Sequence, residues 1–383
     1  MAVHFEPSEL AARRDAAIAA MRTGGLDGLL IFRQESMYYL TGYDTFGYVF
    51  FQCLYLGADG AMTLLTRSAD LRQARHTSVI GDVRVWVDGP DANPASDLRA
   101  ILEEHGCEGR RLGVEWESYG LTARNGRRLE AALTGFCRLE DASELVSRLR
   151  AVKSAAEIAY VRRAAELADD AYHAAVAATG SGASEADLLA DMQGAVFRGG
   201  GDYPGNEFII GSGRDALLCR YFSGRRELGA VDQLTLEWAG AYRHYHAAMM
   251  RTFVVGDVPA AQRRMHDVSL EALTAVEAAV RPGNTFGDAF EAHARVIDAA
   301  GMAEHRLNAC GYSLGTTFAP NWMDWPMLYR GNPVEFEPGM VVFCHMIIFD
   351  SDAELAMTLG ETVLVTAGGH ERLSSAPLDL VVK

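Results

Sequence analysis

Two spacings of apolar residues divide the first part of the chain into short elements. Apolar positions recur at helical spacing over residues 8–24, and the pair Gly24-Gly25 is typical of a helix end. Short apolar runs bounded by turn residues predict strands and one further helix downstream. The strands are expected at residues 26–32, 48–56, 62–66, 83–87 and 111–115, and the helix at residues 96–105. This alternation predicts a small α/β domain with helices covering a sheet.

A different pattern begins after residue 150, with longer helices and longer strands. Ser154 followed by Glu157 has the spacing of a capping box, so a long helix is expected to begin there. Further helices are predicted at residues 185–198, 260–280 and 286–300, and strands at residues 207–211, 233–238, 249–255, 340–349 and 362–366. We therefore predict an N-terminal domain over residues 1–147. A C-terminal α+β domain would follow over residues 148–383, with helices on one side of a curved, largely antiparallel sheet.

The composition narrows the choice of partners. The formal net charge is −16 and the pI is near 5.1, which argues against binding to nucleic acid or to anionic membrane surfaces. The 6 cysteines form no C-x-x-C pair, so buried reduced thiols are expected. We find no secretory signal and no apolar run that would span a bilayer. We therefore expect a cytoplasmic protein that acts on a small molecule.

Several segments, from the predicted domain joint onward, occur in the order and spacing of a known family. They are residues 146–154, 233–240, 250–256, 310–315, 337–342 and 360–366. Together they resemble the creatinase/prolidase family, M24. The resemblance implies an N-terminal α/β creatinase-like domain and an α+β pita-bread catalytic domain of the aminopeptidase P type.

The resemblance also implies five metal-ligand positions, and this chain departs from the family at each of them. Metallopeptidases of the family carry Asp, Asp, His, Glu and Glu, where this chain has Glu237, Ala248, Tyr312, His345 and Gly360. Alanine and glycine supply no donor atom, and a phenol replaces an imidazole, so too few ligands remain for two cations. We therefore expect neither a metal nor another cofactor.

Within the family, the metal-free branch of ectoine hydrolase is the more similar one. The similarity lies in residues 236–246, 321–327, 345–347 and 357–362. Creatinase fits less well, because residues 218–221 hold no counterpart of its catalytic histidine, and because Ala248 and His345 stand where it has Glu. The resemblance implies a hydrolase of a non-peptide C–N bond in a small zwitterionic or amidine compound.

Three residues are predicted to carry the chemistry. Glu237 lies near the end of an apolar strand, where a carboxylate is costly unless it is paired or functional, so we interpret it as nucleophile or general base. A structural acid paired with Arg251 or Arg243 is the alternative. His345 is expected to act as general acid or base or to contact substrate, although a packed core histidine fits the same pattern. Tyr312 is expected to face the same cavity, as a hydrogen-bonding phenol or as a packed aromatic.

Further residues are expected to bind the substrate. Arg220 offers a fork-shaped guanidinium for a carboxylate. Trp322, Asp324 and Trp325 combine flat aromatic faces with a carboxylate, which suits a delocalised cation. The same three residues would equally anchor a long loop. Glu361 is treated as a second acid whose partner is unknown.

A segment rich in glycine and aromatic residues, 40–48, adds two candidates. In relatives, the loop at this place reaches the pocket of the neighbouring subunit. The resemblance therefore implies that Tyr43 or Tyr48 covers the substrate of a partner chain, and that the protein is a homodimer.

Two rival functions stay open at this point. His244 and His246 have a spacing that would put both rings on one strand face, and with His345 they could serve an Xaa-Pro dipeptidase with an atypical metal site. The first two histidines could equally lie at a solvated hairpin edge. The second rival is a non-catalytic binding protein that uses the cavity only for recognition.

Overall fold

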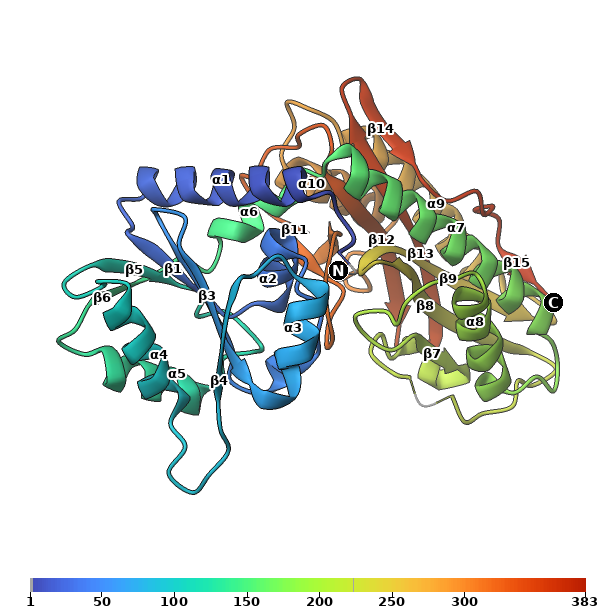
Figure 1. Ribbon diagram of the computed structural model, residues 1–383. Helices are drawn as coiled ribbons and strands as arrows, with labels where there is room; N and C mark the ends of the chain where they lie inside the picture. Colours follow the sequence, from blue (N-terminus) through green and yellow to red (C-terminus); the bar gives the residue numbers. More distant parts are fainter. Residues whose placement is uncertain (1–2, 223) are drawn as a thin grey trace. The chain divides into compact units, whose positions relative to one another are not determined.

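The computed structural model describes residues 3–222 and 224–383, which divide into two compact units between Arg150 and Ala151 (Figure 1). The predicted boundary at residues 147 and 148 falls just before this point, inside helix α6 (Leu145–Ala151). Each unit has its own sheet and its own apolar core. In the part of the chain that is described, none of the helices has both the length and the apolar character that a membrane span requires.

The N-terminal unit is built on a mixed sheet of 6 strands. In spatial order these are β4 (Asp82–Trp86), β3 (Met62–Arg67), β2 (Cys53–Gly57), β1 (Gly28–Ile31), β5 (Arg111–Val114) and β6 (Arg138–Asp141). Its helices are α1 (Pro7–Thr23), α2 (Gln34–Thr41), α3 (Leu71–Thr77), α4 (Pro94–Glu104), α5 (Ala123–Leu133) and α6. The predicted α/β domain is confirmed. Strand β2 begins later than predicted, because Gly47–Val49 forms a 3-10 turn.

The C-terminal unit is built on a sheet of 9 strands. Its main path runs β11 (Asp324–Tyr329), β10 (Ala309–Ser313), β12 (Val341–Asp350), β13 (Leu355–Thr366), β9 (Tyr245–Val255), β8 (Asp232–Tyr242) and β7 (Ile209–Ser212). Neighbouring strands on this path are antiparallel. The short strands β14 (Gly369–Arg372) and β15 (Val381–Val382) pair with β13 and β9. Asp324 and Trp325, expected to anchor a long loop, begin the edge strand β11, which forms by pairing with β10.

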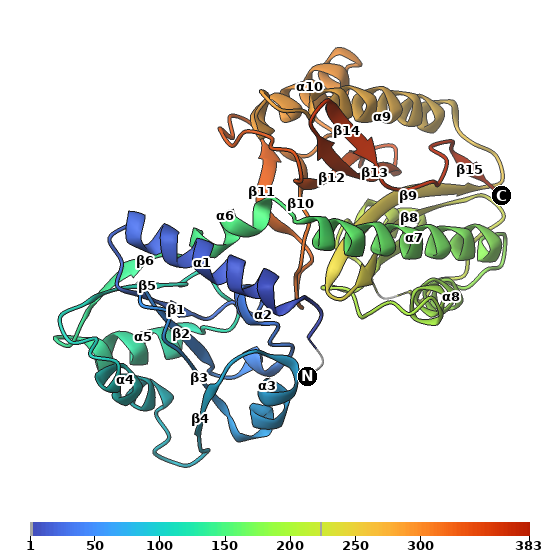
Figure 2. The same ribbon diagram turned by 45° about the horizontal axis from the view of Figure 1, so that its top comes forward.

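Long helices pack against this sheet (Figure 2). Helix α7 (Ala155–Ala178) packs on β8 and β9, α8 (Glu185–Arg198) on α7, α9 (Ala260–Ala279) on β12 and β13, and α10 (Phe286–Ala299) on β11. The predicted capping box is present, because the Ser154 side chain accepts from the Glu157 amide and the Glu157 carboxylate accepts from the Ser154 amide. The fold class expected from the sequence is thus confirmed.

One face of the sheet is turned toward α7, and the alternation along β8 decides which side chains lie there. The Trp238 indole Nε1 donates to the Ala168 carbonyl oxygen of α7 at 2.9 Å. Gly240 lies against the same helix, since a Cβ at this position would be 1.9 Å from the Ala164 carbonyl oxygen. Because successive side chains of a strand point to opposite faces, Glu237 points away from α7.

Candidate active site

A row of four paired residues crosses the centre of the C-terminal sheet. Glu237 on β8 pairs with Met250 on β9. Met250 pairs with Gly360 on β13, and Gly360 pairs with His345 on β12. Directly paired residues of neighbouring strands share one face. The register therefore places Glu237 and His345 on the same face, although they are far apart in the sequence.

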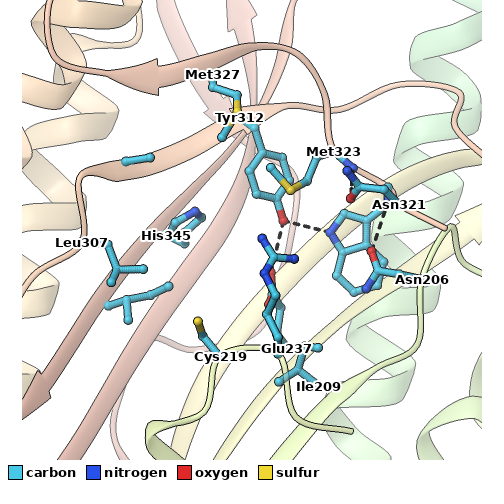
Figure 3. Close-up of a pocket in the computed structure, with 14 residues that line it drawn as sticks. Asn206, Ile209, Cys219, Glu237, Leu307, Tyr312, Asn321, Met323, Met327 and His345 are labelled. Carbon is cyan, nitrogen blue, oxygen red and sulfur yellow. Dashed lines mark hydrogen bonds between the residues drawn. The ribbon is translucent and has the colours of Figure 1, made fainter. Parts of the chain in front are cut away.

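A pocket of about 140 Å³ lies on this face (Figure 3). Its lining residues are Asn206, Ile209, Cys219, Arg220, Glu237, Leu307, Ala309, Tyr312, Asn321, Trp322, Met323, Met327, His345 and Ile347. A volume of this order holds one six-membered ring. Charged and hydrogen-bonding groups share the wall with aliphatic and thioether side chains, so the pocket suits a small, amphiphilic ring.

Glu237 is a carboxylate held by one phenol (Figure 3). The Tyr312 hydroxyl donates to Glu237 Oε1 at 3.1 Å. Burial raises the pKa of Glu237 to about 7, against the lowering effects of the Tyr312 hydrogen bond and of the Arg220 guanidinium. A carboxyl group that titrates near neutrality in a pocket has the property expected of a general base or nucleophile.

The structural alternative for Glu237 does not fit these contacts. Arg251 lies on the opposite face of the sheet, where it forms an ion pair with Glu361. Arg243 donates to the Tyr160 hydroxyl. Within residues 3–222 and 224–383, Glu237 forms no ion pair with either arginine, so its burial is not explained by such a partner.

His345 offers a neutral imidazole to the pocket. The residue is only 8% exposed, and its Nδ1 has no hydrogen-bond partner in the described part of the chain. Burial lowers the pKa of His345 to about 3, and the nearby His293 acts in the same direction. The ring is therefore uncharged near neutral pH. Of the roles expected from the sequence, accepting a proton fits this state better than starting as a charged acid.

Arg220 and Cys219 come from the segment before β8. The Arg220 guanidinium lines the pocket and forms no hydrogen bond or ion pair with any described residue. It is thus available to an anionic group of a ligand. Burial raises the pKa of the Cys219 thiol, against the lowering effect of the Arg220 charge, and Glu237 also raises it, so this thiol stays protonated and is a poor nucleophile.

Trp322 is fixed by two hydrogen bonds and is 1% exposed. Its indole Nε1 donates to the Tyr312 hydroxyl at 2.8 Å, and its backbone amide donates to Asn206 Oδ1 at 3.2 Å. Asn206 and Asn321 also line the pocket and were not predicted as site residues. No local signal marks them, because asparagines are common in loops for their turn-forming side chains.

The structure does not bring Asp324, Trp325 or Glu361 to this pocket. Asp324 accepts from the Trp325 amide at 2.9 Å, and Trp325 packs against the apolar core of the C-terminal unit. Glu361 follows Gly360 in β13, so the alternation of the strand turns its side chain to the other face. Tyr43 and Tyr48 are buried in the N-terminal unit. Their predicted role toward a partner chain stays a prediction.

The donor set of a two-metal site is absent here. Among the described residues, no group of three or more His, Cys, Asp and Glu side chains could hold a metal ion. The Phe343 ring occupies the space beside Gly360, since a Cβ at Gly360 would lie 2.8 Å from the ring Cζ and 3.0 Å from Met250 Cβ. The residues present therefore do not fit a pair of cations.

The two other histidines do not form a metal pair either. Arg243 and His244 form the two-residue turn between β8 and β9, with φ of 50° and 65°. His244 stacks on Phe318, with ring centroids 4.2 Å apart. His246 Nε2 accepts from the Gly205 amide at 2.8 Å, and Nδ1 lies 3.1 Å from Thr317 Oγ1. Both ring nitrogens of His246 are thus engaged, and the expected shared strand face does not exist.

A substitution at Gly360 tests how tightly this place is filled. Gly360→Ala is expected to destabilise the protein by about 1–3 kcal/mol, because its methyl group would overlap the Phe343 ring and Met250 Cβ. Chemical denaturation measures the loss. Gly368→Ala is the matched control, since nothing lies within 4 Å of a Cβ there. Equal losses in the two variants would contradict the packing, whereas Phe343→Leu combined with Gly360→Ala should recover stability.

Comparison with known proteins supports the family resemblance and the fold. Residues 13–152 match the creatinase/prolidase N-terminal domain, and residues 159–367 match metallopeptidase family M24. The chain is 28% identical over 398 residues to the ectoine hydrolase of Halomonas elongata, covering 99% of this chain and 98% of that protein. It is 22% identical over 371 residues to the Xaa-Pro dipeptidase of Pyrococcus furiosus, covering 96% of this chain and 99% of that protein.

A solved structure shows the same fold. The prolidase from Thermococcus sibiricus superposes with a TM-score of 0.89 at 20% identity, covering 99% of this chain and 100% of that chain. The family match at residues 159–367 spans more than half of the sequence and follows the matching N-terminal domain. The chain therefore belongs to metallopeptidase family M24.

Proposed function

We propose that the chain is a hydrolase that opens a C–N bond in a small cyclic zwitterion without a metal ion. An ectoine-type cyclic amidine is the first candidate substrate. The observation that carries the proposal is Glu237, a carboxyl group with a pKa of about 7 in a ring-sized pocket whose residues lack a metal donor set. The relative from Halomonas elongata is an ectoine hydrolase, which supports this substrate class.

The geometry suggests how the groups share the reaction. Arg220 holds the substrate carboxylate, because its guanidinium lines the pocket and forms no hydrogen bond or ion pair with a described residue. Glu237 Oε2 then attacks the sp² carbon between the two nitrogens, or removes a proton from a water molecule that attacks it. In the base route, the C–N bond breaks as the departing nitrogen gains the proton that Glu237 took from water, relayed by the neutral imidazole of His345. In the nucleophile route, a water molecule afterwards adds to the same carbon and breaks its bond to Glu237, which restores the carboxylate.

Removal of metal tests the proposal directly. The purified full chain, treated with a chelator and dialysed, is incubated with ectoine, and the ring-opened N-acetyl diamino acid is followed by proton NMR. We expect turnover to survive chelation. Hydrolysis of Xaa-Pro dipeptides that requires added Mn²⁺ and disappears with chelator would overturn the proposal. A thermal shift without product would favour the binding-protein alternative.

The pH dependence follows from the direction of the Glu237 shift. Burial raises its pKa to about 7, so the carboxylate form is lost as the pH falls through that value. If Glu237 acts as nucleophile or base, kcat/KM rises with increasing pH up to about pH 7, with the slope of a single ionisation, and is level above that pH. His345, with a pKa near 3, adds no second limb between pH 5 and 8. A profile that falls above pH 7 would instead indicate that Glu237 acts as an acid.

A further inference from the structure

We infer that Trp322 is a positioning residue, which acts through Tyr312 to fix the orientation of the Glu237 carboxylate rather than by contact with the substrate. The inference rests on the proposed function, because it assigns a role within that site. It changes the role expected from the sequence, where Trp322 was an aromatic face for a delocalised cation.

The direction of the hydrogen bonds carries this inference. An indole N–H only donates, and an ionised carboxylate only accepts. Trp322 Nε1 is 2.8 Å from the Tyr312 hydroxyl oxygen, and that oxygen is 3.1 Å from Glu237 Oε1. The phenol therefore accepts from Trp322 and must direct its single proton to Glu237. Without the indole, the same hydroxyl could rotate and donate elsewhere.

The hydrogen bond from Tyr312 engages one of the two oxygens of the Glu237 carboxylate. Oε1 is occupied by the phenol, while no described residue donates to Oε2. The free oxygen is thus the one that meets the substrate. It also follows that Tyr312 cannot donate its proton to the substrate while it is bonded to Glu237, so it is not the acid of the reaction.

The backbone of Trp322 is itself held by a contact with the loop that contains Gly205 and Asn206. Its amide donates to Asn206 Oδ1 at 3.2 Å. The neighbouring Gly205 packs so closely that a Cβ there would lie 2.9 Å from the Trp322 nitrogen. His246 Nε2 accepts from the Gly205 amide at 2.8 Å. Because a backbone amide only donates, His246 carries its proton on Nδ1, where Thr317 Oγ1 lies 3.1 Å away.

The other groups that face Glu237 do not replace this arrangement. Arg220 acts on the carboxylate by charge, and Cys219 is protonated in the pocket. His345 is neutral and lines another part of the wall. Among the residues described, only Tyr312 hydrogen-bonds the carboxylate, so the donor that fixes Tyr312 controls its geometry.

The test is a double-mutant cycle on the pKa of Glu237. The carboxyl band is titrated by difference infrared spectroscopy in wild type, Trp322→Phe, Tyr312→Phe and the double variant, with Glu237→Gln as the blank. Tyr312→Phe should raise the pKa by about one unit, because a hydrogen bond to the charged form is lost. Trp322→Phe should raise it by about half of that. The double variant should match Tyr312→Phe alone, since Trp322 acts through the phenol.

A purely structural role for Trp322 predicts a different outcome. It would lower stability without moving the pKa, or would add fully to the effect of Tyr312→Phe, and either result overturns the inference. Trp325→Phe is the matched control, because this neighbouring tryptophan packs in the core outside the pocket and should leave the pKa unchanged. If Trp322→Phe does not fold, Asn206→Ala loosens the Trp322 backbone instead and should shift the pKa in the same direction.

The titration also separates this inference from the proposed function. It needs no substrate, so an unshifted pKa overturns the positioning role even when ectoine is hydrolysed. Conversely, a shift in the variants together with an inactive wild type would overturn the proposed reaction and leave the positioning role in place. In an active enzyme, the acidic limb of kcat/KM should move by the same amount as the titration, and kcat should fall more than KM rises.

Discussion

Glu237→Gln is expected to lower kcat/KM by on the order of 10⁴-fold, because a side chain of almost the same shape loses both its charge and its nucleophilicity. The amide oxygen still accepts the proton of Tyr312, so the hydrogen bond at 3.1 Å can persist. The fold should therefore survive. In the wild type, burial disfavours the ionised carboxylate, as its pKa of about 7 indicates. At pH 8 the neutral variant should thus be at least as stable as the wild type.

Two measurements decide this prediction. Steady-state kinetics with the cyclic amidine gives the loss, and circular dichroism with thermal unfolding shows whether the fold is intact. Glu207→Gln is the matched control, since Glu207 is an exposed carboxylate close in sequence to β7 that does not line the pocket, and it should retain full activity. Activity of Glu237→Gln within tenfold of the wild type would contradict the role of Glu237 as nucleophile or general base. If Glu237 is the nucleophile, intact-protein mass spectrometry of quenched turnovers should show a covalent adduct that the variant lacks.

Arg251→Met is expected to cost about 3–5 kcal/mol of stability, because it leaves the carboxylate of Glu361 buried without its counterion. Arg251 is 2% exposed and Glu361 is fully buried. The guanidinium also donates to the carbonyl oxygens of Met250 and Gly360, at 2.9 and 2.7 Å. Burial raises the pKa of Glu361, and the charge of Arg251 opposes that effect. Without the arginine, the acid must either stay charged in the core or take up a proton.

Equilibrium unfolding in urea measures this loss for the C-terminal unit. The ion pair of Arg162 with Glu371 is the control, because its side chains are 45% and 43% exposed. Arg162→Met should cost less than about 1 kcal/mol. Replacing both buried partners, as Arg251→Met with Glu361→Leu, should recover most of the loss, since no charge is then left unpaired. A small effect of the single variant would show that Glu361 is protonated in the wild type.

The ion pair of Arg251 and Glu361 also contradicts the prediction that Glu361 binds the substrate. Glu361 stands beside Gly360, one of the five family ligand positions, and was therefore assigned to the site. A shift of one residue in a strand turns a side chain to the opposite face. Glu361 accordingly faces the helices, while Gly360 pairs with His345 on the pocket side. Two consecutive residues of a strand point to opposite faces of the sheet, so they do not line the same site.

Elements with a strong local signal were predicted, and those without one were missed. The helices α7, α9 and α10 have apolar faces of several turns, and α7 has the capping box of Ser154. Helix α2 (Gln34–Thr41) was not predicted, because almost all of its residues are buried and no polar face marks a helical period. The edge strand β11 was not predicted either, since its conformation depends on pairing with β10.

The family and the fold class could be predicted from the sequence, because caps, apolar periods and family segments are properties of short stretches of chain. The sequence also shows Ala248 and Gly360, which have no donor atoms, at two of the ligand positions that the resemblance implies. It also marked Glu237, His345 and Tyr312 as residues to consider. Which residues share the pocket follows only from the tertiary structure. Strand pairing places Glu237 and His345 in one row, and strand alternation turns the side chain of Glu361 to the opposite face of the sheet. The tertiary structure also makes Tyr312 the donor in its hydrogen bond to Glu237, because the Trp322 indole, which a loop contact holds in place, donates to the Tyr312 hydroxyl. Hydrogen bonds between distant segments need a folded chain, so no pattern along the sequence can specify them.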